Sequence, residues 1–151
     1  MFLGAALGIA PIGAWMAITG EWNWLAFLLG SGVLAWVAGF DVIYACQDYD
    51  FDLAENLFSI PKTFGIAGAL MISRLLHLMA FSVLVALGYL CELGWMYFAG
   101  VFVVGAILLY EQSLVKPKDL SRVNVAFFNL NGVVSVMYFL FTAGDVFLLK
   151  N

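Results

Sequence analysis

The sequence contains few charged residues, and this scarcity excludes several classes of protein. Only 11% of its 151 residues are charged, whereas about a quarter of the residues in a soluble globular domain carry a charge. Lysine and arginine together number six, which is too few for the basic patch that nucleic-acid-binding proteins use. Neither a soluble globular domain nor a nucleic-acid partner is therefore indicated.

Cysteine is equally scarce, and the chain contains only Cys46 and Cys91. Neither has a histidine or a second cysteine at the spacing of a zinc site. The orientation predicted below places them on opposite sides of a membrane, so they cannot form a disulfide with each other. We expect both to be small apolar packing residues.

Apolar residues, in contrast, make up 65% of the chain, and the mean hydropathy is +1.04. They form runs close to the ~20 residues that a helix needs to cross a bilayer. The composition therefore predicts an all-α membrane protein, a single domain of about five transmembrane helices. The expected spans are residues 1–19, 24–40, 64–90, 95–110 and 123–149.

The positive charges predict how the spans are oriented. Two polar loops, at residues 41–62 and 111–122, are expected on one side of the membrane, and Lys150 is the only cation on the other side. Because positive charge favours the cytoplasmic side, we expect a multi-pass protein of the inner (cytoplasmic) membrane with both loops and the active side facing the cytoplasm. The loop cations are Lys62, Lys116, Lys118 and Arg122.

Acidic residues gather in one stretch, at residues 39–65. On a continuous helix, Asp41, Asp48 and Asp52 would share one stripe with Tyr44. Carboxylates on one stripe repel each other unless a cation lies among them. Asp48 and Asp52 are one helical turn apart, which suits Mg²⁺, an ion that keeps several waters and often bridges to a substrate phosphate. The stretch therefore predicts a magnesium site.

Two other interpretations of the acidic residues remain open. The alternation of Asp48, Asp50 and Asp52 is typical of the start of a calcium-binding loop. That motif needs glycine at its sixth position and glutamate at its twelfth, where this chain has Leu53 and Ser59, so we set it aside. The remaining alternative is a solvated acidic loop between two spans, which needs no ligand.

Three further residues are candidates for the site. Pro61 suits the first turn of a helix, and Lys62 beside it can contact a phosphate there or be an ordinary interfacial lysine. Arg74 and His77 lie inside the third expected span, where an ionisable group is costly and should face the bundle interior or a wet cavity. Arg74 can instead reach towards the cytoplasmic face or pair with an acid, and His77 can be a hydrogen-bonded structural histidine.

The second polar loop carries Lys116, Lys118 and Asp119 on the same expected side as the acidic stretch. These residues can help to hold a diphosphate. The alternative is that they set the topology by contacting lipid head groups.

The run DVIYACQDYDFD at residues 41–52 matches the pattern DxxYAxxDxxxD. This pattern strongly resembles the second aspartate-rich motif of the UbiA superfamily of intramembrane prenyltransferases. The resemblance is to the 4-hydroxybenzoate polyprenyltransferase branch and its menaquinone-pathway relatives in particular. The runs LFSIPKTFG at residues 57–65 and RLLH at residues 74–77 also resemble that branch, and the similarity extends over essentially the whole chain.

The resemblance implies a complete fold of nine transmembrane helices around a central cavity that opens to the cytoplasmic side. It also implies two aspartate-rich motifs that hold Mg²⁺ and the diphosphate of a polyprenyl donor. On this match Asp48 and Asp52 would be the metal ligands and catalytic residues, and Asp41 and Tyr44 would support them in the same motif.

Lys62 and Arg74 are the expected contacts to the donor diphosphate. The implied activity is Mg²⁺-dependent transfer of a polyprenyl group from polyprenyl diphosphate to an aromatic acid in the membrane. The acceptor, 4-hydroxybenzoate or a related naphthoate, and the prenyl chain length stay open. The implied pathway is quinone biosynthesis, of ubiquinone or of menaquinone.

One departure from the family pattern is large. The first aspartate-rich motif, of the form NxxxDxxxD, does not occur in the chain. Together with five expected spans in place of nine, this absence indicates the C-terminal portion of such an enzyme, a partial UbiA-type bundle. We therefore expect the missing N-terminal half as a partner, and the isolated chain can be inactive without it.

Two functions of other classes compete with the transferase. A cation-coupled membrane transporter fragment would use the acidic stripe as an ion site, but transporter sites lie near the bilayer midplane on broken helices. A noncatalytic fragment that only binds a partner would bind neither Mg²⁺ nor diphosphate.

Overall fold

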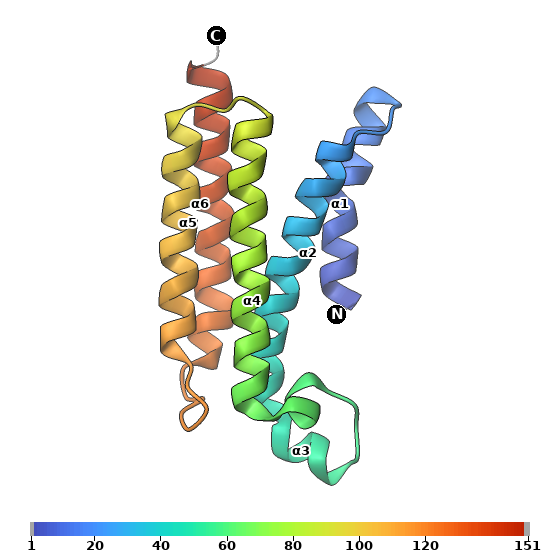
Figure 1. Ribbon diagram of the computed structural model, residues 1–151, viewed down its shortest axis with the longest axis vertical. Helices are drawn as coiled ribbons and strands as arrows, with labels where there is room; N and C mark the ends of the chain where they lie inside the picture. The colour runs from blue at the N-terminus through green and yellow to red at the C-terminus, as the bar shows by residue number, and fades with distance from the viewer. Residues whose placement is uncertain (1, 150–151) are drawn as a thin grey trace.

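The computed structural model describes residues 2–149, which are helical apart from short connections (Figure 1). No strand occurs in this part of the chain, only an isolated β-bridge between Lys116 and Asp119. The all-α class is therefore confirmed. The α-helices are α1 (Phe2–Thr19), α2 (Trp24–Ala45), α3 (Tyr49–Ala54), α4 (Ile60–Leu90), α5 (Trp95–Leu114) and α6 (Asn131–Gly144), the last flanked by π-helical turns at Val125–Leu130 and Asp145–Leu149.

The expected apolar helices are all present among the described residues. α1 is apolar but has only 18 residues, and the other four segments are long and apolar enough to cross a membrane. The chain is therefore a multi-pass membrane protein, as its composition predicted. The four segments are Trp24–Ala54, Ile60–Leu90, Trp95–Leu114 and Val125–Leu149.

The long helices form a bundle in which neighbours along the chain run in opposite directions (Figure 1). α1 and α2 form a hairpin, α2 also packs along α4, and α5 contacts both α4 and α6. Residues 46–59 and 115–124 lie at the same end of the bundle, the lower end in Figure 1. We call this end the acidic-loop end. The two polar loops therefore share one side, as expected.

The cysteines lie as the predicted topology requires. Cys46 is buried at the acidic-loop end, whereas Cys91 follows the last residue of α4 at the opposite end. They form no disulfide. This prediction is confirmed.

The start of α4 explains how a cleft can form beside it. Ser59 is the N-cap, and its Oγ accepts a hydrogen bond from the Lys62 amide (3.2 Å). Pro61 lies in the first turn, as predicted. Gly65 then adopts φ 69° and ψ 166°, which is not helical, and glycine tolerates this positive φ without strain. The first turn therefore leaves the axis of the rest of α4.

Glycines allow two close helix approaches. A Cβ on Gly30 of α2 would overlap the carbonyl oxygen of Gly8 on α1, and a Cβ on Gly39 of α2 would overlap the ring of His77 on α4. Small residues at such crossings let backbones come close, as is common between helices in membranes. Gly39 thereby brings the end of α2 that carries Asp41 against α4.

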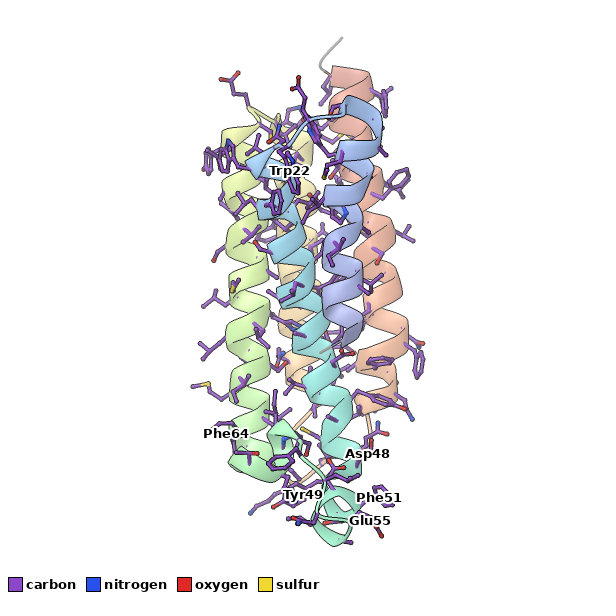
Figure 2. The ribbon with its side chains drawn as sticks, turned by 90° about the vertical axis from the view of Figure 1, so that its right-hand side faces the viewer. Trp22, Asp48, Tyr49, Phe51, Glu55 and Phe64 are labelled. Atoms are coloured by element: carbon purple, nitrogen blue, oxygen red, sulfur yellow. The ribbon has the colours of Figure 1, made fainter. Side chains whose placement is uncertain are left out.

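The outer surface of the bundle is rich in large apolar side chains (Figure 2). Ile18 is 85% exposed, Phe102 and Leu109 are each 75% exposed, and Phe139 is 68% exposed. A continuous apolar surface of this kind is unfavourable in water and suits the lipid phase. Most of the long helices therefore present one face to lipid or to further helices.

Candidate functional site

The acidic segment does not form the single continuous helix that the stripe of carboxylates assumed. α2 ends at Ala45, a 3₁₀ turn covers Cys46–Asp48, and α3 begins at Tyr49. A 3₁₀ turn has about 3.0 residues per turn in place of 3.6, so it rotates the residues after it relative to α2. Asp41 on α2 and Asp52 on α3 therefore do not keep the relation that a continuous helix would give them.

The three motif aspartates differ in exposure. Asp41 is half-buried, Asp48 is exposed, and Asp52 is buried at 8% exposure. Neither the Asp48 nor the Asp52 carboxylate has a hydrogen bond or ion pair to another described residue. Figure 2 shows Asp48 beside Tyr49, Phe51 and Glu55 at the acidic-loop end.

Asp41 lines a cleft of about 370 Å³, which we call the Asp41 cleft. One wall is the end of α2, from Ala38 to Ala45, and the other is the segment 58–64, which includes the displaced first turn of α4. The cleft therefore combines a carboxylate with the N-terminal end of a helix. Amide groups at a helix N-terminus favour an anion, and Thr63 adds a hydroxyl to the lining.

Lys62 lies in the same first turn of α4. Its Nζ donates a hydrogen bond to Oδ1 of Asn56 (2.6 Å), in the loop that links α3 to α4. Asn56 has a positive φ of 54°, so the loop turns sharply there. The ammonium group is thus held near the start of α4, beside the segment that forms the wall of the Asp41 cleft.

Tyr44, the other predicted supporting residue, faces a different neighbour. Its ring lies 4.5 Å from that of Phe127, between centroids, and 6.4 Å from that of Phe128. Next to it, Gln47 Nε2 donates a hydrogen bond to Oδ1 of Asn124 (3.3 Å). Tyr44 and Gln47 therefore join the motif to the chain just before α6.

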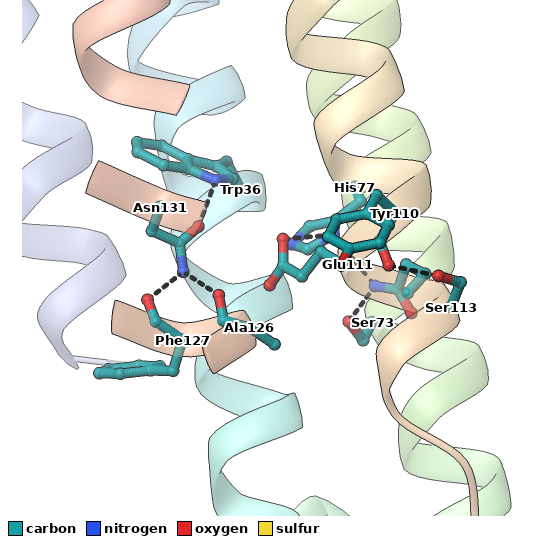
Figure 3. A network of polar contacts seen from close by, with 10 residues as sticks. Trp36, Ser73, His77, Tyr110, Glu111, Ser113, Ala126, Phe127 and Asn131 are labelled. Carbon is teal, nitrogen blue, oxygen red and sulfur yellow. Dashed lines mark hydrogen bonds and ion pairs between the residues drawn. The ribbon is translucent and has the colours of Figure 1, made fainter. Parts of the chain in front are cut away.

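A second polar cluster lies inside the bundle, between α4 and α5 (Figure 3). Gln112 Nε2 donates a hydrogen bond to Ser73 Oγ (2.8 Å) and lies 3.0 Å from His77 Nδ1. Glu111 is fully buried, and its Oε2 lies 4.0 Å from His77 Nδ1. Neither carboxyl oxygen of Glu111 nor Nε2 of His77 has a hydrogen-bond partner among the described residues. His77 thus faces the bundle interior, as expected for an ionisable residue in a span.

Glu111 was expected in the second polar loop, and this expectation is wrong. α5 continues to Leu114, so Glu111 lies inside the helix and faces α4. The acid followed by glutamine and serine looked like the start of a loop. The helix continues because Leu108 and Glu111 fall on the same buried face, one turn apart.

Two further polar residues join helices. Asn131 Oδ1 accepts a hydrogen bond from Trp36 Nε1 on α2 (3.0 Å), and its Nδ2 donates to the carbonyl of Phe127 (2.7 Å; Figure 3). Asp145 is fully buried and accepts hydrogen bonds from the amides of Gly94 (2.7 Å) and Tyr97 (3.2 Å). An acid within an apolar span is the signal that points to Asp145.

Arg74 does not line the Asp41 cleft. It is exposed and lines a separate groove between α4 and α5. The structure therefore brings Asp41 and the start of α4 together but places Arg74 elsewhere. Its predicted contact with the donor diphosphate stays a prediction.

The second polar loop forms a tight hairpin at the acidic-loop end (Figure 1). The backbones of Lys116 and Asp119 pair with N···O distances of 3.1 and 2.9 Å. Asp119 Oδ1 accepts hydrogen bonds from the Ser121 hydroxyl (2.6 Å) and amide (3.1 Å), which lower the pKa of Asp119. Asp119 thus stabilises its own turn. Lys116 and Lys118 are exposed, and both of their predicted roles stay predictions.

The motif offers few donor groups to a magnesium ion. No group of three or more His, Cys, Asp or Glu side chains could hold an ion within the described part of the chain. Asp48 is the N-cap of α3 and Asp52 lies in its first turn, and the Asp52 carboxylate has no hydrogen bond or ion pair to another described residue. Mg²⁺ commonly takes one or two protein carboxylates and completes its shell with waters and substrate phosphates. The residues fit that kind of site.

The chain matches the UbiA prenyltransferase family over residues 1–133. It is 34% identical over 131 residues to a 4-hydroxybenzoate octaprenyltransferase of Marinobacter nauticus, covering 87% of this chain and 44% of that protein. It is 33% identical over 139 residues to the protein of that name from Vibrio campbellii, covering 91% and 49%. The chain thus spans about half the length of these relatives. No solved structure matches.

Proposed function

The chain belongs to the UbiA prenyltransferase family, and we propose that it forms part of an intramembrane aromatic prenyltransferase. This enzyme would transfer a polyprenyl group from polyprenyl diphosphate to an aromatic acid. The observation that carries the proposal is the run DVIYACQDYDFD at residues 41–52, at the acidic-loop end of a bundle whose relatives are 4-hydroxybenzoate octaprenyltransferases.

Asp48 and Asp52 are the residues we propose as the holders of Mg²⁺. Asp52 supports this role because the residue is 8% exposed and its carboxylate has no hydrogen bond or ion pair to another described residue. When bound, the ion supplies positive charge that offsets the charge on the leaving diphosphate. Because Asp48 and Asp52 supply only two of the ligands that the ion needs, we propose that the first aspartate-rich motif, in the part of the relatives that this chain does not cover, supplies the others.

Lys62 and the start of α4 are the groups we propose for the diphosphate. The amide ends of a helix N-terminus and an ammonium group both favour a phosphate. The hydrogen bond from Lys62 to Asn56 shows that the ammonium can be held beside this turn. Tyr44 acts as a positioning residue, since its ring packs against Phe127 and anchors the motif to the chain before α6.

The proposed acceptor is 4-hydroxybenzoate or a related naphthoate, so the enzyme would serve ubiquinone or menaquinone biosynthesis. Breaking the bond from the allylic carbon to the diphosphate leaves an allylic cation, which the electron-rich ring attacks; the ring then loses the proton at the attacked carbon, so that the products are the prenylated acid, diphosphate and a proton. Apolar walls keep water away from that cation. The positive residues of the two polar loops favour the cytoplasmic side for the acidic-loop end.

The location of the aspartates favours this proposal over an ion transporter. A transporter site is expected near the bilayer midplane, whereas α3 and Asp48 lie at the end of the bundle (Figures 1 and 2).

The test is binding of geranyl diphosphate to the purified chain in detergent, with and without Mg²⁺. We expect Mg²⁺-dependent binding that Asp48→Asn and Asp52→Asn each weaken by about tenfold or more, since each removes an ionic ligand. Asp50→Asn is the matched control, because Asp50 is exposed on the same short helix. Equal losses in all three variants, or binding that ignores Mg²⁺, would refute the metal assignment.

Activity is tested in membranes that also contain the part of the Marinobacter nauticus relative that this chain does not cover. We expect labelled polyprenyl diphosphate to prenylate 4-hydroxybenzoate only when both pieces are present. Asp48→Asn should abolish this transfer while leaving the amount of inserted chain unchanged.

A further inference from the structure

A groove of about 540 Å³ runs between α4 and α5 on the outer surface of the bundle, and we call it the α4–α5 groove. It is separate from the Asp41 cleft, which is lined by α2 and by segment 58–64. Two of its lining residues, Phe102 and Leu109, are each 75% exposed. The groove is therefore open at the surface of the described bundle.

The lining of the groove changes character along its length. α4 and α5 are antiparallel (Figure 1), so Arg74 on α4 lies level with Gln112 on α5, towards the acidic-loop end. Phe81 and Phe102 lie further along, towards the other end. The polar lining residues are thus all at one end, and the remainder of the groove is apolar. This gradient matches an amphiphile with one polar head and one apolar tail.

Arg74 supplies a charge that nothing in the described chain neutralises. Its side chain is exposed and has no hydrogen bond or ion pair to another described residue. It lies eight residues beyond Ile66, the first residue after the kink at Gly65, which is about 12 Å along the apolar part of α4 at 1.5 Å per residue. An unpaired cation at that depth is costly. A ligand with a single negative charge would remove the cost.

We propose that the α4–α5 groove binds a carboxylate-headed amphiphile with one apolar chain, namely the prenylated aromatic acid formed by the proposed reaction. The carboxylate pairs with Arg74, and the prenyl chain lies along Phe81 and Phe102. This inference rests on the proposed function, because that reaction makes the compound. The groove would then hold the product at the surface of the described bundle after the reaction.

The depth and charge of Arg74 favour this occupant over a phospholipid. Phospholipid phosphates lie at head-group level, outside the hydrocarbon core, whereas Arg74 lies within the apolar part of α4. A guanidinium pairs well with one carboxylate through two parallel hydrogen bonds. A free diphosphate carries more charge than one guanidinium offsets, and it has no tail for the apolar end.

The test uses the chain in nanodiscs of phosphatidylcholine and measures binding of fluorescent 3-geranyl-4-hydroxybenzoate. We expect Arg74→Gln to weaken binding by about tenfold, the size of one lost ionic contact of about 1.4 kcal/mol. Arg122→Gln is the matched control, because it removes the same charge from an exposed position in the second polar loop. Ala106→Trp fills the groove from an exposed lining position and should weaken binding to a similar extent without touching Arg74.

Competition identifies the occupant. The methyl ester of the probe, which lacks the charge, should compete at least about tenfold less well than the acid. Equal competition by the ester, equal binding by the Arg74→Gln and Arg122→Gln variants, or displacement by oleate or phosphatidylglycerol as strong as by the acid itself would each overturn the proposal.

The probe needs neither Mg²⁺ nor turnover, so this result is independent of the metal test. Loss of Mg²⁺-dependent diphosphate binding alone would count against the proposed function. Loss of the selectivity for the acid, with diphosphate binding intact, would count against the groove alone.

Discussion

Replacing Glu111 with methionine should make the protein more stable. Glu111 is fully buried, and neither of its carboxyl oxygens has a hydrogen-bond partner among the described residues. An unsatisfied buried polar group costs about 1–3 kcal/mol, and an apolar residue of similar shape removes that cost. We therefore expect Glu111→Met to raise the free energy of unfolding by about 1–3 kcal/mol. Reversible unfolding in mixed micelles, by titration with a denaturing detergent, measures it.

The neighbouring residue provides a control of opposite sign. Gln112 donates a hydrogen bond to Ser73 (2.8 Å) and contacts His77 Nδ1 (3.0 Å), so Gln112→Met should lower the free energy of unfolding by about 1–2 kcal/mol. Glu111→Met would instead lower the free energy of unfolding if Glu111 formed a strong ion pair with His77. Two charges 4.0 Å apart would attract by about 4 kcal/mol at an effective dielectric constant of 20. A clear loss of stability in Glu111→Met would therefore refute the reasoning.

Two other predictions follow from the ends of the bundle. Asp145→Ala should lower the free energy of unfolding by about 1–2 kcal/mol, because the amides of Gly94 and Tyr97 lose their acceptor, and Asp145→Asn should lose less in the same detergent titration. Cysteines placed at Lys118 and Trp22 should react with a membrane-impermeant maleimide from opposite sides of the membrane. The reason is that segment 115–124, which contains Lys118, and Trp22 lie at opposite ends of the bundle. Labelling of both cysteines from one side would contradict the topology.

The helices were predictable from the sequence because each is a long apolar run bounded by polar residues. Their starts were less predictable. α4 begins at Ile60, four residues before the expected start, because Ser59 caps it and the backbone turns at Gly65. The 3₁₀ turn at Cys46–Asp48 was not predictable from the sequence pattern. It leads into α3, which packs against α4.

The candidate site was predictable to the extent that it is local. Asp48 is the N-cap of α3 and Asp52 lies in its first turn, and the motif identifies both of them in the sequence alone. The Asp41 cleft was not predictable, because its second wall comes from segment 58–64, which folds back beside α2. Both Arg74 and Lys62 are predicted to contact the diphosphate, yet Arg74 lines the α4–α5 groove, whereas the Lys62 ammonium group is bonded to Asn56 in the loop before α4.

Glu111 shows the difference between what the sequence determines and what only the tertiary structure determines. Composition and runs of apolar residues establish that the chain crosses a membrane, where its long apolar helices lie and where the carboxylates gather, because these properties depend on short-range hydrophobicity and on spacing along one helix. Burial of Glu111 against His77, capping of α5 by Asp145 and formation of the α4–α5 groove depend on which faces of distant helices meet. Side-chain packing between helices decides which faces are in contact, and the sequence of a single helix does not specify its contacts with the others.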